Sequence, residues 1–288
     1  MDSKKLIVLA MLAGAGLAQD QKLRIIAIGA HPDDCDIKFG GTAAKFARAG
    51  HAVKFLSVTN GDAGHQAQGG GDLAKRRFLE TQESARRLGI AEYEVLDNHD
   101  GELTPNLEVR KQIIRAIRRW NADIVVAPRP NDYHPDHRYT GVLVQDAAYM
   151  VVVPNVAPDT PPLKKNPIFL YYSDGFQKPA PFRPDVVVAL DDIWDTKVHA
   201  LDAHTSQVYE WLPWVDGRLE TVPKDAAERK RWLSKQRYRG VMSPLMRQAL
   251  EARYGKDAAA KVGVVESFEL CEYGRQPSLD ELRAMFPK

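Results

Sequence analysis

Short apolar runs alternate with amphipathic helical segments along most of this chain of 288 residues. The apolar runs predict strands over 23–29, 53–59, 93–96, 123–127 and 186–190. Apolar residues at helical spacing predict helices over 39–49, 73–88, 109–120 and 137–152. A repeated strand–helix order predicts an α/β fold, in which helices cover both faces of a largely parallel sheet.

Two polar motifs follow two of these predicted strands. The segment AHPDD begins at Ala30, directly after the strand over 23–29, and HPDH covers residues 134–137, just beyond the strand over 123–127. Open α/β sheets place their ligand sites at the carboxyl ends of the strands. We therefore expect the two motifs to meet at one edge of the sheet and to form a single site.

The side chains of these motifs suit a catalytic metal ion. His31 and His137 offer imidazole nitrogens, while Asp33 and Asp34 follow each other on a tight turn, where adjacent side chains diverge. One carboxylate would complete a set of three ligands with an open fourth position, and the other would act as a base toward metal-bound water. Residue chemistry alone leaves open which aspartate does which. Each motif taken separately also fits a capped helix start or a solvated salt bridge, but their common place at one sheet edge favours a site.

The motifs resemble those of the LmbE-like/PIG-L zinc-dependent deacetylases, which remove acetyl groups from N-acetylglucosamine conjugates. The resemblance covers most of residues 23–268 and implies a Rossmann-like three-layer sandwich with a mostly parallel sheet. Besides AHPDD and HPDH, five segments are similar to landmarks of that family: Thr59-Asn-Gly-Asp62, Arg77-x-x-Glu80, Asp100-Gly101-x-Leu103, His204-x-Ser206-Gln207 and Glu266-x-Phe268.

Several roles follow from this resemblance. It implies that the zinc ligands are His31, Asp34 and His137. Asp33 would be the general base that deprotonates the bound water, and His134 would stabilise the oxyanion and protonate the leaving amine, with Asp136 orienting its ring. Iron or cobalt could fill the same ligand set. In place of the tyrosine that some relatives carry two residues before His134, this chain has Asp132, and its nearest tyrosine is Tyr133.

Contacts with the substrate are expected from a second group of residues. The resemblance implies that Arg77 and Asp100 bind sugar hydroxyls; the alternative is an internal ion pair that supports the glycine-rich loop over 61–71. His204 is expected near the site as a packing residue and not as a fourth ligand. Trp211 and Trp214 could stack on sugar rings, although core packing is the commoner use of tryptophan.

The activity that these features predict is the hydrolysis of the acetyl amide of an N-acetylated amino sugar or N-acetylglucosamine conjugate, with zinc as the cofactor and Asp33 activating the zinc-bound water. A metal-dependent amidase for a bulkier conjugate is one alternative. A carbohydrate-binding protein of the same fold without catalysis is another. The resemblance implies that the partner is a small-molecule amino sugar. A net charge of +2 with mixed signs shows no nucleic-acid footprint.

The first 18 residues predict a cleaved signal peptide, because lysines precede a short apolar run that ends at a small-residue cleavage pattern. We then expect an exported protein, periplasmic or extracellular, without a stable membrane span. The sequence leaves open whether the protein forms a homo-oligomer. Residues 19–288 would form one α/β deacetylase domain, whose part over 154–288 is less regular. Cys35 and Cys271 do not indicate a disulfide framework.

Overall fold

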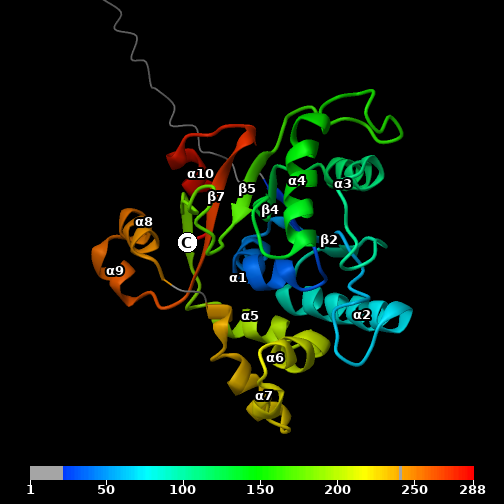
Figure 1. Ribbon diagram of the computed structural model, residues 1–288. Helices are drawn as coiled ribbons and strands as arrows, with labels where there is room; N and C mark the ends of the chain where they lie inside the picture. Colours follow the sequence, from blue (N-terminus) through cyan, green and yellow to red (C-terminus); the bar gives the residue numbers. More distant parts are fainter. Residues whose placement is uncertain (1–21, 240–241) are drawn as a thin grey trace, which may run out of the picture.

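The computed structural model describes residues 22–239 and 242–288, so the predicted signal peptide lies outside the described residues. Within this part of the chain, one sheet contains seven strands in the order β3-β2-β1-β4-β5-β7-β6 (Figure 1). The strands are β1 Arg24–Gly29, β2 Ala52–Ser57, β3 Glu92–Val95, β4 Ile124–Ala127, β5 Ile168–Tyr172, β6 Val186–Ala189 and β7 Val265–Gly274.

The sheet is parallel except for one strand. β1 pairs in parallel with β2 on one side and with β4 on the other. β7 runs antiparallel to both of its neighbours, β5 and β6. The predicted α/β fold with a mostly parallel sheet is therefore confirmed. The sequence pattern did not locate β5 or β7, because Pro-rich and irregular segments surround them.

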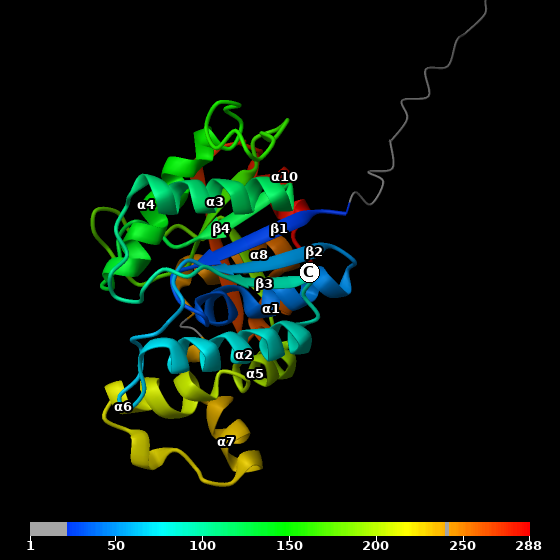
Figure 2. The ribbon, with the colours of Figure 1, turned by 90° about the vertical axis from the view of Figure 1, so that its right-hand side faces the viewer.

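Helices cover both faces of the sheet, as Figure 2 shows. Alternate residues of β1 point to opposite faces: Ile25 and Ala27 pack in one hydrophobic cluster with α1 and α2, and Ile26 and Ile28 pack in another with α3 and α4. These four helices are α1 Asp34–Arg48, α2 Gly70–Leu88, α3 Leu107–Trp120 and α4 Pro135–Met150. The arrangement is the expected three-layer sandwich.

All four of these helices begin earlier than the sequence pattern predicts. α1 begins at Asp34, five residues before the predicted start, so this carboxylate lies in the first helical turn. α4 begins at Pro135, whose fixed φ suits a first helical position, with His134 as its N-cap residue. α2 begins at Gly70 and takes in the end of the predicted loop. The two motifs therefore form the starts of helices, where apolar periodicity is absent and gives no signal.

The part after α4 is less regular but packs on the same core. One hydrophobic cluster extends from Ile25 in β1 to Phe286 near the end of the chain. The remaining helical elements are α5 Trp194–Leu201, the π-helix η1 Ser206–Trp211, α6 Leu212–Val215, η2 Leu219–Thr221, α7 Ala226–Leu233, η3 Arg237–Arg239, α8 Pro244–Tyr254, α9 Lys256–Lys261 and α10 Leu279–Met285. None of the helices in the described ranges combines the length and the apolar character that crossing a bilayer requires.

A buried carboxylate ties the late strand β7 to α1. Glu266 accepts hydrogen bonds from the backbone N–H groups of Gly41 at 3.0 Å and Thr42 at 2.7 Å. Lys197 donates to the same carboxylate at 2.7 Å and also to the Ile37 carbonyl at 2.7 Å. A Cβ atom on Gly41 would lie only 2.7 Å from the Leu190 side chain, so this close packing requires glycine. The expected landmark Glu266-x-Phe268 thus holds α1 in place.

Candidate active site

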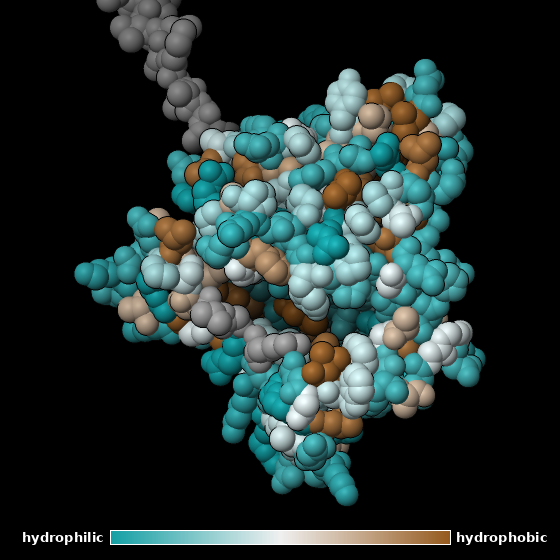
Figure 3. Space-filling view, in the orientation of Figure 1, coloured by the Kyte–Doolittle hydropathy of each residue, from teal (hydrophilic) through white to brown (hydrophobic). Residues whose placement is uncertain are grey.

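The two motifs meet at the carboxyl edge of the sheet, as the sequence predicts. β1 and β4 are neighbours, and AHPDD and HPDH follow their carboxyl ends. The chain order of the strands reverses at this point, since β1 leads to β2 and β3 on one side and β4 leads to β5 on the other. Such a reversal leaves a crevice in an open α/β sheet. In the space-filling view the surface is hollowed over α1, between the sheet and the segment that carries α5 to α7 (Figure 3).

Three side chains place donor atoms at the distances expected for ligands of one metal ion, and Asp34 faces each histidine through a different carboxylate oxygen. His31 Nδ1 is 3.2 Å from His137 Nε2 and 3.5 Å from Asp34 Oδ2. His137 Nε2 is 3.4 Å from Asp34 Oδ1. Ligands 2.0–2.1 Å from a tetrahedral zinc ion are separated by about 3.3 Å. The triangle formed by His31, Asp34 and His137 therefore fits zinc, which makes it the ligand set that we propose.

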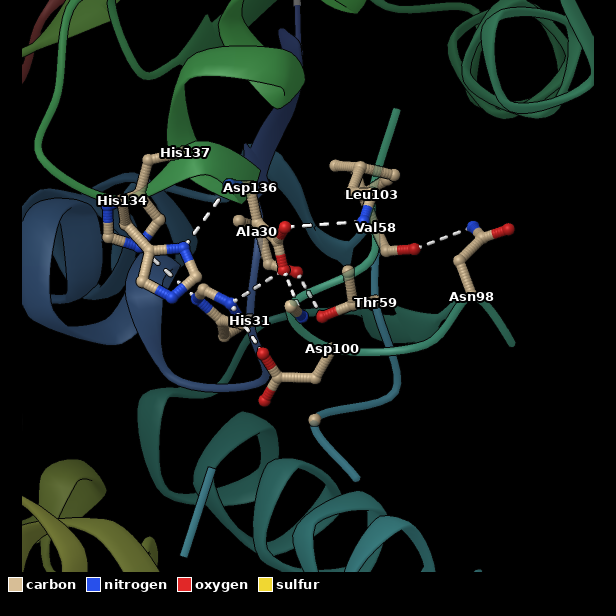
Figure 4. Close-up of polar contacts among 12 residues, drawn as sticks. Ala30, His31, Val58, Thr59, Asn98, Asp100, Leu103, His134, Asp136 and His137 are labelled. Carbon is tan, nitrogen blue, oxygen red and sulfur yellow. Dashed lines mark hydrogen bonds and ion pairs between the residues drawn. The ribbon is translucent and has the colours of Figure 1, made fainter. Parts of the chain in front are cut away.

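Neighbouring carboxylates orient both imidazoles toward that triangle, and Figure 4 shows Asp100 and Asp136 beside His31. His31 Nε2 faces Asp100 Oδ1 at 3.1 Å and Asp136 Oδ2 at 3.3 Å. His137 Nδ1 faces Asp132 Oδ1 at 3.1 Å. A proton on each of these nitrogens leaves the other ring nitrogen with a free lone pair, directed into the triangle. Sequence reasoning missed this role of Asp132, although a carboxylate close to a ligand histidine is a common partner in metal sites.

Two other groups of possible donors share His31. One consists of His31, His134 and His137, and the other of His31, Asp100 and Asp136, with the ligand atoms of each group within 4.8 Å of one another. The second group would need the lone pair of His31 Nε2, which faces two carboxylates and is better placed to donate. We therefore regard Asp100 and Asp136 as partners of the ligand His31 and not as ligands.

The charges at the site favour a cation. Burial alone would lower the pKa of His31, but the carboxylates of Asp100, Asp136 and Asp34 raise it well above its usual value. Burial also acts to lower the pKa of His137, yet Asp34 and Asp132 raise it to about 9. Four carboxylates around two imidazoles thus attract positive charge, which protons or a divalent cation can supply.

Asp33 lies apart from the three proposed ligands. Its side chain is buried, and its Oδ1 accepts a hydrogen bond from Arg77 Nη2 at 3.2 Å. Burial raises the pKa of Asp33, and the charge of Arg77 opposes that rise. The carboxylates of neighbouring residues therefore diverge: Asp34 faces both histidines, whereas Asp33 faces an arginine.

Arg77 is 2% exposed and lies beneath the glycine-rich loop. Besides Asp33, it contacts the Gly61 carbonyl at 3.1 Å and Asp100 Oδ2 at 3.5 Å. Gly61 has φ +72°, and a Cβ atom there would approach the guanidinium to 2.6 Å. This internal network is the alternative that the sequence left open for Arg77 and Asp100. Their contact with a substrate stays a prediction.

The carboxylate of Asp136 faces a different partner from the one expected. We predicted that it orients the His134 ring; instead it accepts from the backbone N–H groups of Gly101 at 2.7 Å and Leu103 at 3.3 Å and faces His31. The backbone N–H of Asp136 is the group that meets His134, donating to its Nδ1 at 3.2 Å. The reason is the early start of α4, which turns this fully buried side chain under the loop around Gly101.

Other predicted or overlooked residues surround this centre. His204 is completely buried, with Nε2 3.2 Å from Asp36 Oδ2, and contacts none of the proposed ligands directly. A narrow cavity of about 30 Å³ lies beside Asp34 and His137, and Lys38 and Arg129 contribute to its lining. Sequence reasoning missed both cations. Cys35 and Cys271 are both buried free thiols.

Comparisons with known proteins bear on the family and the fold. A family model described as "GlcNAc-PI de-N-acetylase" matches residues 26–148. The chain is 33% identical over 203 residues to the diacetylchitobiose deacetylase of Thermococcus kodakarensis, covering 66% of this chain and 73% of that protein. The crystal structure of the N,N'-diacetylchitobiose deacetylase from Pyrococcus horikoshii is 28% identical, with a TM-score of 0.63 over 88% of this chain and 84% of the other. The hydratase GalB from Pseudomonas putida has a TM-score of 0.62 at 18% identity over 89% of this chain and 99% of the other, which shows the fold alone.

Proposed function

Because this chain belongs to the PIG-L/LmbE-like family of N-deacetylases, we propose that it hydrolyses the acetyl amide of an N-acetylglucosamine-containing sugar with the help of a zinc ion. One observation carries the proposal: donor atoms of His31, Asp34 and His137 lie 3.2–3.5 Å apart, and the buried carboxylate of the adjacent residue, Asp33, faces Arg77 instead. The first group suits a catalytic metal and the second suits a general base.

His31, Asp34 and His137 would hold the metal. When bound, zinc polarises the amide carbonyl and lowers the pKa of a water molecule toward neutrality. Iron(II) or cobalt(II) suits the same set of nitrogen and oxygen donors. Asp100 and Asp136 face Nε2 of His31, and Asp132 faces Nδ1 of His137. These carboxylates determine which nitrogen of each ring is available to bind the metal, so both imidazole ligands are already oriented.

Asp33 would act as the general base. Its carboxylate takes a proton from the attacking water as the water oxygen bonds to the carbonyl carbon. Arg77 holds this carboxylate by one oxygen, which leaves the other oxygen for that proton. The carbon–nitrogen bond then breaks and the nitrogen takes up the proton from Asp33, not from His134 as the sequence predicted, because the neutral His134 ring is too weak an acid. A free amine and acetic acid leave, and the acid ionises to acetate by giving its proton to solvent.

His134 would stabilise the oxyanion. Its Nδ1 accepts from the backbone of Asp136, so in the neutral ring the proton resides on Nε2. Burial lowers the pKa of His134, and the charges of His31 and His137 lower it further, which keeps the ring neutral. A neutral Nε2–H group can donate a hydrogen bond to the oxygen that gains charge in the transition state.

The experiment is a substrate panel. Metal-free protein, reloaded with zinc, is incubated with N-acetylglucosamine, N,N'-diacetylchitobiose and glycosides of N-acetylglucosamine, and both acetate and free amine are measured. We expect the two products in equal amounts and only in the presence of metal. Binding of these sugars without release of acetate would contradict the proposal and favour a carbohydrate-binding protein. Cleavage of larger amides alone would favour the amidase.

A further inference from the structure

Two tryptophans form a partly exposed aromatic pair near the site. Trp211 ends the π-helix η1, and Trp214 follows in α6, so the two indoles lie on one side of a continuous helical turn. Their rings stack with an interplanar angle of 16° and a centroid separation of 5.3 Å. Trp214 is 49% exposed, which is unusual for so large an aromatic side chain. We call these two side chains the tryptophan pair.

One member of the tryptophan pair, Trp211, lies against the wall of the proposed active site, and Trp214 stacks on it. The position that a Cβ atom of Gly64 would occupy is 3.1 Å from Asp100 Oδ2, 2.9 Å from Arg77 Nη1 and 3.8 Å from Trp211 Nε1. Asp100 in turn faces the proposed ligand His31. One glycine of the loop therefore separates the indole of Trp211 from the carboxylate that orients a metal ligand. In Figure 2, α6 lies next to the beginning of α2, where this loop ends.

Several side chains hold η1, which carries Trp211, against that loop. Gln207 in η1 donates to the Gly64 carbonyl at 3.1 Å. Glu210 receives hydrogen bonds from Arg76 at 2.9 and 2.5 Å and contacts His65 at 2.9 Å. Short π-helical turns frequently mark functional sites, because they displace side chains from the regular helical pattern. Here the turn ends at Trp211, so a ligand would meet aromatic rings that are already fixed.

The chemistry of the pair points to a sugar ring. A pyranose presents a face of C–H groups that packs on an indole, and hydroxyl groups around its rim that need donors and acceptors. Trp211 Nε1 makes no hydrogen bond to any residue that the structure describes, so it is free to donate to such a hydroxyl. The nearby charges of Arg76 and Glu210 offset each other in an ion pair. A neutral ring is therefore favoured over a charged group.

We propose that the tryptophan pair is the binding site for a second pyranose ring, next to the N-acetylglucosamine unit that loses its acetyl group. This inference rests on the proposed function and narrows it. The preferred substrate is then a disaccharide or longer glycan with a neutral second sugar, and not the monosaccharide.

The test compares two substrates in three variants. Trp214→Ala removes the exposed ring, Trp214→Phe retains an aromatic face, and Tyr149→Ala removes a 70% exposed aromatic from the carboxyl-terminal part of α4, away from the site. For each zinc-loaded protein, kcat/KM is measured with N,N'-diacetylchitobiose and with N-acetylglucosamine. We expect Trp214→Ala to lower the ratio of the two values about fivefold to tenfold, mainly through KM for the disaccharide. Trp214→Phe should keep most of the ratio, and Tyr149→Ala all of it.

A direct binding measurement separates this inference from the proposed function. Chitobiose, which carries no acetyl group to cleave, is titrated into each protein at a pH at which its amino groups are uncharged, while tryptophan fluorescence and heat are recorded. Weaker binding to Trp214→Ala than to Trp214→Phe supports the second-ring site, even if the protein proves not to be a deacetylase. Equal loss of kcat/KM for both substrates, or equal binding of chitobiose to all variants, would overturn the inference while leaving the deacetylase proposal intact.

Discussion

The ring nitrogens of His31 and His137 each face a defined partner, and this determines which lone pairs point into the proposed metal site. Asp132 is the carboxylate behind His137, at 3.1 Å from Nδ1. It stands where some relatives of the family are expected to have a tyrosine. We infer that in this chain the position serves the ligand ring and not the oxyanion.

Replacing Asp132 by alanine should therefore weaken zinc binding. We expect a loss of tenfold to about a hundredfold in affinity, the usual effect of removing the hydrogen-bond partner of a ligand histidine. Competition with a chromophoric chelator measures it without relying on catalysis. Asp195→Ala, which removes an exposed carboxylate from α5, is the control. Unchanged affinity in Asp132→Ala would show that His137 needs no such partner.

The sequence identified most residues of the site, but it did not predict many of the contacts between them. His31, Asp34 and His137 were predictable as neighbours because parallel strand ends meet at one sheet edge. The partner of Asp136 was not predictable, because the loop around Gly101 and Leu103 comes from 33 to 35 residues earlier in the chain. The same holds for Asp100, whose contact with His31 depends on how that loop folds over α4.

The loop over 61–69 is held in place by salt bridges from other structural elements. Arg76 on α2 and Glu210 on η1 form its main link, and His65 of the loop joins them. The hydrogen bonds from Arg76 lower the pKa of Glu210; burial opposes this, and His65 adds to the lowering. A lowered pKa in the folded state means that the link is intact above the unfolded carboxylate pKa of about 4.3. It is lost as the pH falls through the lower, folded value.

Glu210→Gln should reproduce at neutral pH what acid does to the wild type. We expect faster amide hydrogen exchange of residues 61–69 in this variant, and the same increase in the wild type only below about pH 4. Glu228→Gln, a change at an exposed position of α7, should leave the exchange of the loop unaltered. Fully protected loop amides in Glu210→Gln would show that the glycine-rich loop holds its shape without the link.

α1 depends on a buried ion pair from later in the chain. Lys197 and Glu266 have side chains exposed by only 2% and 4%. Lys197→Met removes the cation and leaves a buried carboxylate with backbone partners alone, so we expect a loss of about 3 kcal/mol in the free energy of unfolding. Urea denaturation measures this loss, and Lys75→Met at an exposed position of α2 is the control. A loss as small as that of the control would mean that the hydrogen bonds from Gly41 and Thr42 satisfy the carboxylate alone.

Elements with regular apolar periodicity could be predicted, and those without it could not. Ile25 to Ile28 alternate between two hydrophobic layers and were recognisable as a buried strand. The first turn of α1 contains Asp34 and Asp36, whose polarity hid the helix start. β7 lies between β5 and β6 and runs antiparallel to both. The sequence near β7 does not indicate this direction, because the tertiary fold determines which strands pair.

At the scale of the whole molecule, the fold positions two carboxylates for different tasks. The reversal of strand order between β1 and β4 creates the crevice, and the helix start after β1 directs Asp33 and Asp34 to opposite sides. Asp34 meets the two histidines and Asp33 meets Arg77. The division of labour between a metal ligand and a base is the central claim about this enzyme, and it can be tested on the intact protein.

The most direct measurement determines bound zinc and acetate release on the same samples of wild type, Asp33→Asn and Asp34→Asn. We predict that Asp33→Asn keeps one zinc ion per chain and loses about a hundredfold to ten-thousandfold in kcat, as expected when a general base is removed. Asp34→Asn should lose the zinc together with the activity. Full activity in Asp33→Asn, or loss of zinc from Asp33→Asn with retention in Asp34→Asn, would contradict the account.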